Sequence, residues 1–194
     1  MTDQKKCEWC LDQSLYEEYH DTEWGVPVHE DRKHFEFMVL DAFQAGLSWW
    51  IILKKRDNFR KAFDNFDPVK VARYNEDKIQ ELLSDKGIVR NQMKIRAAVK
   101  NAVAFLEVQQ EFESFDNYIW KFVGGVPLQN AWKTLQDIPP KTEESEAMSK
   151  DLLERGFKFV GPTIVYAYMQ AAGLVNDHMT HCFRYSELSS GTKK

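Results

Sequence analysis

Two pairs of soft metal ligands stand near opposite ends of the chain. Cys7 and His20 lie near its start, and His178 and Cys182 lie near its end. The second pair is separated by four residues, which on a helix is one turn and directs both side chains to one face. Thiolates and imidazoles are ligands that Zn²⁺ prefers, so this pattern indicates a metal site. A metal bound by all four would join the two ends of the chain.

Two further residues compete as ligands. Cys10 follows Cys7 at the spacing of a zinc knuckle, and His181 directly precedes Cys182. Spacing alone therefore leaves the ligand set open. Whichever residues bind, a cross-link between distant segments stabilises a fold more than a short loop closure does.

A glycine-bounded turn is a candidate phosphate site. Residues 156–161 begin and end with glycine and carry Lys158, and Pro162 suits the first turn of the helix that follows. With helices predicted over 146–154 and 162–172, this is the layout of a helix-hairpin-helix. Backbone N–H groups at such a turn can hold one DNA phosphate without reading sequence. A corner between two packed helices, with glycine for close packing, is the alternative.

Aromatic residues and one acid could form a binding pocket. Tyr16 and Tyr19 are three residues apart and share a face if their segment is helical. Asp41 interrupts an apolar helical pattern, so it is either turned inward or a partly exposed, capping residue. The chain has six Trp and seven Tyr, which a large aromatic core would also explain.

Helical periodicity dominates the rest of the chain and predicts an all-α fold. Ser48 and Asp67 are candidate N-caps, and the segment 91–107 should direct Lys94, Arg96 and Lys100 outward. Residues 126–145 read as a loop or extended linker, and a helix should begin near Ser145. The predicted helices cover residues 33–44, 49–63, 91–107, 115–122, 146–154 and 162–172, with shorter ones starting near Asp67 and Asn75.

Composition sets the broad class. A chain of 194 residues with 43% hydrophobic residues fits one globular domain, expected over residues 1–188 as two helical lobes with the pocket between them and a flexible tail at 189–194. No run is long enough to span a membrane, and no secretory signal is visible. Three cysteines suit a reducing cytoplasm. The net charge of −4 does not by itself indicate nucleic-acid binding, although a local basic face could still bind.

Six motifs, in this order along the chain, resemble DNA-3-methyladenine glycosylase I, a bacterial family of base-excision-repair enzymes. The resemblance extends from Cys7 to Cys182. The motifs are YHDTEWGVP (19–27), QAGLSW (44–49), LKKR (53–56), FDPVKVA (66–72), RGFKFVGPT (155–163) and QAAGLVNDH (170–178).

The resemblance implies a helix-hairpin-helix glycosylase fold with one structural zinc ion per chain. Its zinc ligands correspond to Cys7, His20, His178 and Cys182, which disfavours Cys10 and His181. Four protein ligands complete a tetrahedron and leave no position for a catalytic water.

The resemblance also implies a pocket for 3-methyladenine extruded from double-stranded DNA. Electron-rich rings attract a positively charged base, and a carboxylate can accept hydrogen bonds from its amine. The family's pocket residues correspond to Trp9, Tyr16, Tyr19, Asp41 and Trp49. Gly46 and Leu47 resemble its plug into the gap left by the base. Further expected DNA contacts are Lys158, Gly161 and Thr163, with Arg155 and the cluster 54–56 as phosphate ligands.

Two departures from the wider pattern bear on mechanism. The pocket carboxylate is typically Glu in this family, and Asp41 is one methylene shorter. Where related superfamily members carry a catalytic Asp before a His, this chain has Asn176 or Asp177. Since the cationic base is already a good leaving group, we expect catalysis by binding and stacking more than by acid–base transfer. A lyase needs a lysine nucleophile there, and none is present.

The resemblance predicts a monofunctional hydrolase of the N-glycosidic bond, with free 3-methyladenine as product, active as a cytoplasmic monomer without membrane contact. The alternative is a catalytically weak protein of the same fold that binds DNA lesions. A third possibility is a helical interaction protein cross-linked by zinc.

Overall fold

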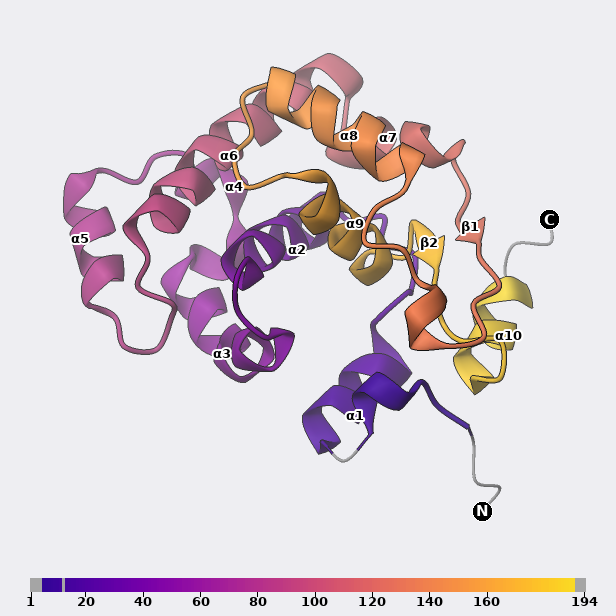
Figure 1. Cartoon of the computed structure of the whole chain (residues 1–194). Coiled ribbons are helices and arrows are strands. Elements are labelled where there is room, and N and C mark those ends of the chain that lie inside the picture. The colour runs from indigo at the N-terminus through magenta and orange to yellow at the C-terminus, as the bar shows by residue number, and fades with distance from the viewer. Residues whose placement is uncertain (1–4, 12, 191–194) are drawn as a thin grey trace.

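The computed structural model describes residues 5–11 and 13–190, and they form a mostly helical chain around one central helix (Figure 1). The principal helices are α1 (Ser14–Thr22), α2 (Asp31–Gln44), α3 (Trp49–Ala62), α4 (Pro68–Val71), α5 (Glu76–Ser84), α6 (Gln92–Phe112), α7 (Phe115–Ile119), α8 (Glu143–Glu154), α9 (Pro162–Ala171) and α10 (Phe183–Ser190). Single 3-10 turns occur at Glu8–Cys10, Asp64–Phe66, Trp120–Val123 and Leu135–Asp137.

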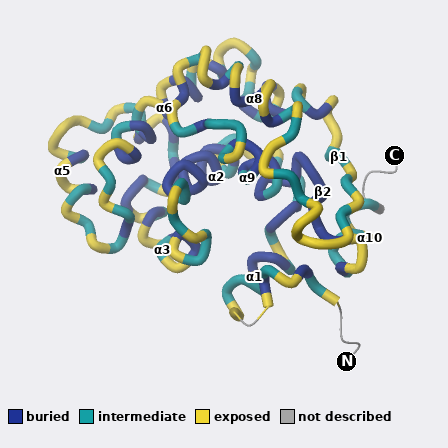
Figure 2. Tube along the Cα trace, in the orientation of Figure 1, coloured by how far each residue is buried: buried dark blue, intermediate teal, exposed yellow. Residues whose placement is uncertain are grey.

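Helix α2 lies at the centre and is buried without interruption from His34 to Phe43 (Figure 2). Helices α3, α6 and α9 pack against it. Its aromatic side chains meet rings from other helices edge to face, with Phe35 5.2 Å from Phe105 and Phe43 4.9 Å from Phe59 between ring centroids. Because α2 also carries Asp41, this core fixes the position of that carboxyl group.

Helix starts that depend on local capping agree with the sequence. Asp67 caps α4 through the amides of Val69 and Lys70, and Pro68 occupies the first turn. Asn75 likewise caps α5. Ser48 stands at the N-cap of α3, but its side chain makes no capping hydrogen bond.

Helix α8 begins earlier than predicted because Thr142, not Ser145, is its N-cap. The Thr142 side chain accepts from the Ser145 amide, and the Ser145 hydroxyl lies 2.9 Å from the Thr142 amide, which forms a capping box. The preceding loop is also more ordered than expected. Its strand β1 (Leu128–Gln129) pairs in parallel with β2 (Val175–Asn176) just before the second pair of Cys/His residues.

The end of the chain differs from expectation in two respects. His178 and Cys182 lie in a turn between β2 and α10, so they do not share a helix face. Helix α10 continues through Ser190, two residues beyond the domain boundary predicted at residue 188. Residues 191–194 of the expected tail lie outside the described residues.

Lys94 was predicted to face solvent and is instead buried. Its ammonium donates to the backbone oxygens of Phe43 and Ala45, at 2.8 and 2.5 Å. Arg96 and Lys100 on the same helix are half-buried and exposed, as expected.

The hairpin formed by α8, the turn 155–161 and α9 is held by α6. The Asn101 side chain donates to the oxygen of Lys158 and accepts from its amide, at 3.0 and 2.7 Å. Ser149 donates to the oxygen of Val160. These bonds fix the turn while the Lys158 side chain stays exposed. Among the helices of the described residues, none is long and apolar enough to cross a membrane.

Candidate functional site

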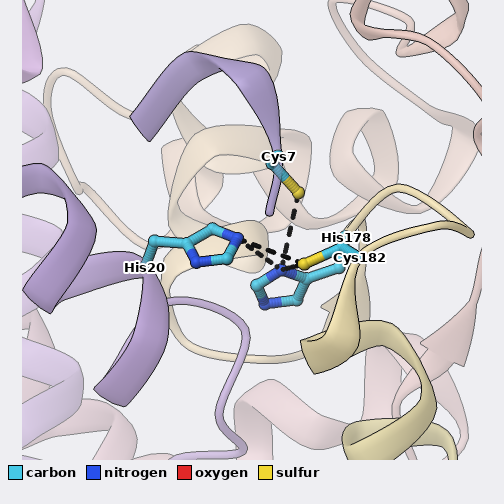
Figure 3. Close-up of side chains that lie close together, drawn as sticks. All are labelled: Cys7, His20, His178 and Cys182. Carbon is cyan, nitrogen blue, oxygen red and sulfur yellow. Dashed lines mark hydrogen bonds between the residues drawn. The ribbon is translucent and has the colours of Figure 1, made fainter. Parts of the chain in front are cut away.

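Four buried side chains from both ends of the chain converge on one point (Figure 3). The ligand atoms of Cys7, His20, His178 and Cys182 all lie within 4.8 Å of one another. His178 Nδ1 is 3.2 Å from His20 Nε2, and the Cys182 sulfur is 3.4 Å from His20 Nε2 and 3.7 Å from His178 Nδ1. Cys7 comes from the N-terminal segment, and the turn after β2 supplies His178 and Cys182.

These separations fit a tetrahedral ion. With metal bonds of about 2.3 Å to sulfur and about 2.0–2.1 Å to nitrogen, neighbouring ligand atoms are about 3.3–3.8 Å apart. The outer nitrogens of both imidazoles already have partners, since His20 Nδ1 lies 2.8 Å from the Asp21 carboxylate and His178 Nε2 lies 3.0 Å from the Trp24 oxygen. Such partners fix the tautomer and direct the opposite nitrogen toward a metal.

The competing ligands lie outside this cluster. Cys10 is buried, but its thiol donates to the Cys7 oxygen at 3.1 Å. His181 is exposed and pairs with Glu8 on the surface. The hydrogen bond to Cys182, together with burial, raises the pKa of Cys7, while the same bond lowers the pKa of Cys182. A bound cation would stabilise both as thiolates.

A cavity of about 390 Å³ opens beside this cluster. Its walls contain all five pocket residues expected from the sequence, and they come from the N-terminal segment, α1, α2 and α3. The described residues that line it are Trp9, Tyr16, Tyr19, Trp24, Asp41, Gln44, Trp49, Leu135, Ile138, Ala167, Gln170 and Ala171.

The ring of Trp9 connects the cavity to the Cys/His cluster. Its centroid lies 5.7 Å from Tyr16 on one side and 5.5 Å from His20 on the other, both in edge-on arrangements. The ring centroids of Tyr19 and Trp49, which also line the cavity, are 5.7 Å apart. An aromatic-lined space of this kind can hold a flat, cationic ring.

Asp41 is the one described lining residue that carries a carboxyl group. It is only 3% exposed, and its buried Oδ2 has no hydrogen-bond partner among residues 5–11 and 13–190. Burial raises the pKa of Asp41 well above its ordinary value, and the charge of Arg56 offsets part of that effect. An unpaired carboxyl oxygen in a cavity is a vacant acceptor for a ligand's donor group.

Two of the cations predicted to contact phosphate form ion pairs with carboxylates of the protein. Arg56 is buried and binds both oxygens of Glu23 at 2.6 Å, and its Nε donates to Glu36 at 2.7 Å. Burial would raise the pKa of Glu23, but the hydrogen bonds to Arg56 lower it to about 2. Arg155 pairs with Glu111 and Asp151. Of the cluster 54–56, Arg56 therefore belongs to an internal ion-pair network with Glu23 and Glu36.

Asp177 is one of the two residues at the position where related superfamily members carry a catalytic Asp, and its carboxylate is held by hydrogen bonds within the protein. Its carboxylate accepts four hydrogen bonds, at 2.6–2.8 Å, from Asn130, Trp132, Tyr166 and Gln170. Asn176 is buried and donates to Gln129. Neither lines the cavity, so Asp177 fastens the loop 126–142 to α9.

The other predicted DNA contacts lie on the surface. Gly46 has a φ of +77°, with no atom within 4 Å of where a Cβ would stand, and Leu47 beside it is half-buried. Gly161 is the N-cap of α9 without a side-chain capping bond, and Thr163 is exposed in its first turn.

Sequence reasoning missed much of the cavity wall. Trp24 stood inside a quoted motif and had the chemistry to suggest a role. Three apolar wall residues have no functional group that the sequence could indicate. They reach the cavity from the loop before α8 (Leu135 and Ile138) and from α9 (Ala167). Gln170 also belonged to a quoted motif. In the structure it lines the cavity and donates a hydrogen bond to Asp177.

Comparison with known proteins agrees with this geometry. Residues 9–185 match the sequence model of the methyladenine glycosylase family. The chain is 48% identical to DNA-3-methyladenine glycosylase 1 of Escherichia coli (strain K12), over 93% of this chain and 97% of that protein. A crystal structure of 3-methyladenine DNA glycosylase I, 48% identical, superimposes with a TM-score of 0.90 over 92% of this chain and 98% of the other. A structure of 3-methyladenine DNA glycosylase I from Staphylococcus aureus, which concerns recognition of 3-methyladenine, superimposes with a TM-score of 0.89. It is 34% identical, and the match covers 92% of this chain and 95% of the other.

Proposed function

The chain belongs to the methyladenine glycosylase family, and on this basis we propose that it removes 3-methyladenine from alkylated double-stranded DNA. It is a glycosylase, an enzyme that hydrolyses N-glycosyl bonds. The observation that carries the substrate assignment is the cavity of about 390 Å³, in which aromatic rings surround the unpaired oxygen of Asp41.

In the proposed reaction the methylated adenine leaves the base stack and enters this cavity. Attachment to the sugar leaves a positive charge on the methylated base. Cation–π attraction to Trp9, Tyr16, Tyr19 and Trp49 contributes about 0.5–2 kcal/mol for each well-placed ring. Asp41 accepts a hydrogen bond from the base and favours its charge.

Hydrolysis then requires little acid–base chemistry from the protein. The bond between C1′ and the base nitrogen breaks, its electron pair goes to the base, and 3-methyladenine leaves as a neutral molecule. Water adds its oxygen to C1′ and releases a proton. Asp177 is held by four donors and lies outside the cavity lining, which supports a mechanism without it. We propose no lyase step.

The Cys/His cluster fits a structural zinc ion, with Cys7, His20, His178 and Cys182 as ligands. The fit rests on the donor separations of 3.2–3.7 Å and on the partnered outer nitrogens of both imidazoles. Zinc here would supply cross-linking and no chemistry, because its four positions are filled by protein.

DNA contacts are proposed at Gly46 and Leu47, which would fill the gap left by the base, and at Lys158, Gly161 and Thr163, which would hold a phosphate. We further propose that residues 1–188 act as one domain, and that the protein works as a monomer in the bacterial cytoplasm.

Release of free base tests the proposal. Duplex DNA treated with a methylating agent is incubated with the protein, and released bases are separated by chromatography. We expect 3-methyladenine in the supernatant, with the DNA strands intact at the resulting abasic sites. Binding to methylated DNA without release would instead identify a lesion-binding protein. Failure to bind both DNA and free 3-methyladenine would favour an interaction protein.

A further inference from the structure

The backbone of Lys94 lies at the start of one helix, and its side chain reaches the end of another. Only the second position is favourable for a positive charge. It occupies the first turn of α6, where its own amide donates to the N-cap Asn91. A cation is unfavourable at a helix N-terminus because the aligned peptide dipoles already make that end positive. The side chain reaches instead to the C-terminal end of α2, where a positive charge is favourable.

The ammonium of Lys94 satisfies backbone acceptors that the end of α2 would otherwise leave without a partner. It donates to the oxygens of Phe43 and Ala45, at 2.8 and 2.5 Å. Helix C-termini leave their last carbonyls without intrahelical donors, and a buried carbonyl without a donor is destabilising. Lys94 is 6% exposed, so water does not compete strongly for these bonds.

The remaining bonds of this turn connect it to the cavity. The Leu47 amide donates to the oxygen of Gln44, at 2.6 Å, and the Gln44 side chain donates back to the oxygen of Leu47, at 3.0 Å. Gln44 itself lines the cavity. The backbone oxygens of residues 43, 44, 45 and 47 are thus each held by a donor, two of them by Lys94.

We propose that Lys94 is a positioning residue for base extrusion, which holds the turn 45–48 so that Leu47 can occupy the space vacated by the flipped base. This inference rests on the proposed function, because it assumes that Leu47 enters the duplex. Lys94 lies outside the cavity lining and would not touch the base. Its effect should therefore appear in the extrusion of a base from duplex DNA and not in the affinity for a base already free.

The test compares Lys94→Met, which keeps most of the apolar stem and removes the charge, with Lys100→Met on the exposed face of α6. We expect single-turnover excision from duplex DNA to fall about ten- to a hundredfold in Lys94→Met, as for loss of charged hydrogen bonds. Affinity for free 3-methyladenine, followed by quenching of the cavity tryptophans, should stay within about twofold of wild type, because Lys94 is not among the residues that line the cavity. Lys100→Met should match wild type in both measurements.

A double-mutant cycle separates positioning from general stability. In a Leu47→Ala background, Lys94→Met should cause little further loss of duplex excision, because residues acting through one another are not additive. An undiminished loss in that background, or an equal loss of free-base affinity, would overturn the inference. If Lys94→Met does not fold, Lys94→Gln, which retains a donor, replaces it in the same cycle. Absence of base release by the wild-type protein would refute the proposed function instead.

Discussion

Asp41 is a buried acid whose missing partner has a direct consequence for ligand binding. Its Oδ2 has no hydrogen-bond partner in the part of the chain that the structure describes, and Asp41 lines the cavity. Asp41→Asn keeps the size of the side chain but removes its capacity for charge. We expect affinity for free 3-methyladenine to fall about tenfold or more, since a hydrogen bond to a charged group contributes about 1.5–3 kcal/mol.

Titration of the cavity fluorescence with 3-methyladenine measures this change. Asp57→Asn on the exposed face of α3 serves as the control, and its affinity should equal that of wild type. Unchanged affinity in Asp41→Asn, together with a large loss of stability, would show that Asp41 is structural.

The same residue predicts how stability varies with pH. Burial raises the pKa of Asp41 in the folded protein, so the unfolded chain gives up this proton first as the pH rises. The contribution of Asp41 to wild-type stability should therefore decline from about pH 4 upward, until the raised pKa is passed. Asp41→Asn lacks this proton, so its melting temperature relative to wild type should increase over the same interval.

Thermal melts of both proteins at about pH 5 and about pH 8 measure the effect, and subtraction cancels the other titrating groups. A difference in melting temperature that does not vary with pH would mean that Asp41 has an ordinary pKa in the folded protein.

Among the elements, the hairpin between α8 and α9 exposes one lysine on a turn that α6 keeps in place. Asn101 binds both the amide and the oxygen of Lys158, so Lys158→Gln should leave the turn intact. If Lys158 contacts one phosphate, the variant's slope of log affinity against log salt should be shallower by about 0.9. Fluorescence anisotropy of labelled duplex DNA at several salt concentrations measures this slope.

Lys150 provides a matched comparison, because it is also exposed but lies within helix α8 and not in the turn. Its replacement by Gln should leave the slope unchanged. Equal slopes for wild type and Lys158→Gln would remove the hairpin lysine from the DNA interface.

The elements also show how far sequence reasoning could reach. Caps at Asp67 and Asn75 were predictable because their partners are two or three residues away. Lys94 was assigned to solvent and Arg56 to a DNA phosphate because their partners are distant in sequence. Phe43 lies 51 residues from Lys94, and Glu23 lies 33 residues from Arg56. The pairing of β1 with β2 joins two residues from each strand, too few for any alternating pattern.

The same distinction applies to the candidate site. Cys7 and His178 could be chosen because their side-chain types are themselves ligands, even across 171 residues. The helical turn predicted between His178 and Cys182 was wrong, although a turn of irregular backbone still brings the two together. Apolar wall residues such as Ala167 could not be predicted, because only the packing of α9 beside the cavity gives them a role.

At the scale of the whole molecule, the Cys/His cluster ties the N-terminal segment to the last turn before α10. The segment that it fixes also carries Trp9, whose ring lies between His20 and Tyr16. A metal at this point would therefore support the cavity wall as well as the fold. Stability, metal content and base affinity should consequently change together.

Cys182→Ala tests this linkage. We expect loss of stoichiometric zinc and a lower melting temperature, with a free-energy loss of up to about 5 kcal/mol, the closure entropy of a loop of this length. Affinity for free 3-methyladenine should fall as well, because Trp9 loses its fixed position against His20. Elemental analysis, thermal melting and fluorescence titration measure the three changes.

Cys10→Ser is the control, since a serine hydroxyl can replace the thiol that donates to the Cys7 oxygen. It should keep one zinc per chain and wild-type affinity. Retention of stoichiometric zinc by Cys182→Ala would mean that Cys10 or His181 completes the site, and the donor separations around His178 would then need another explanation. Loss of zinc with unchanged base affinity would confine the metal to the fold and separate it from the cavity.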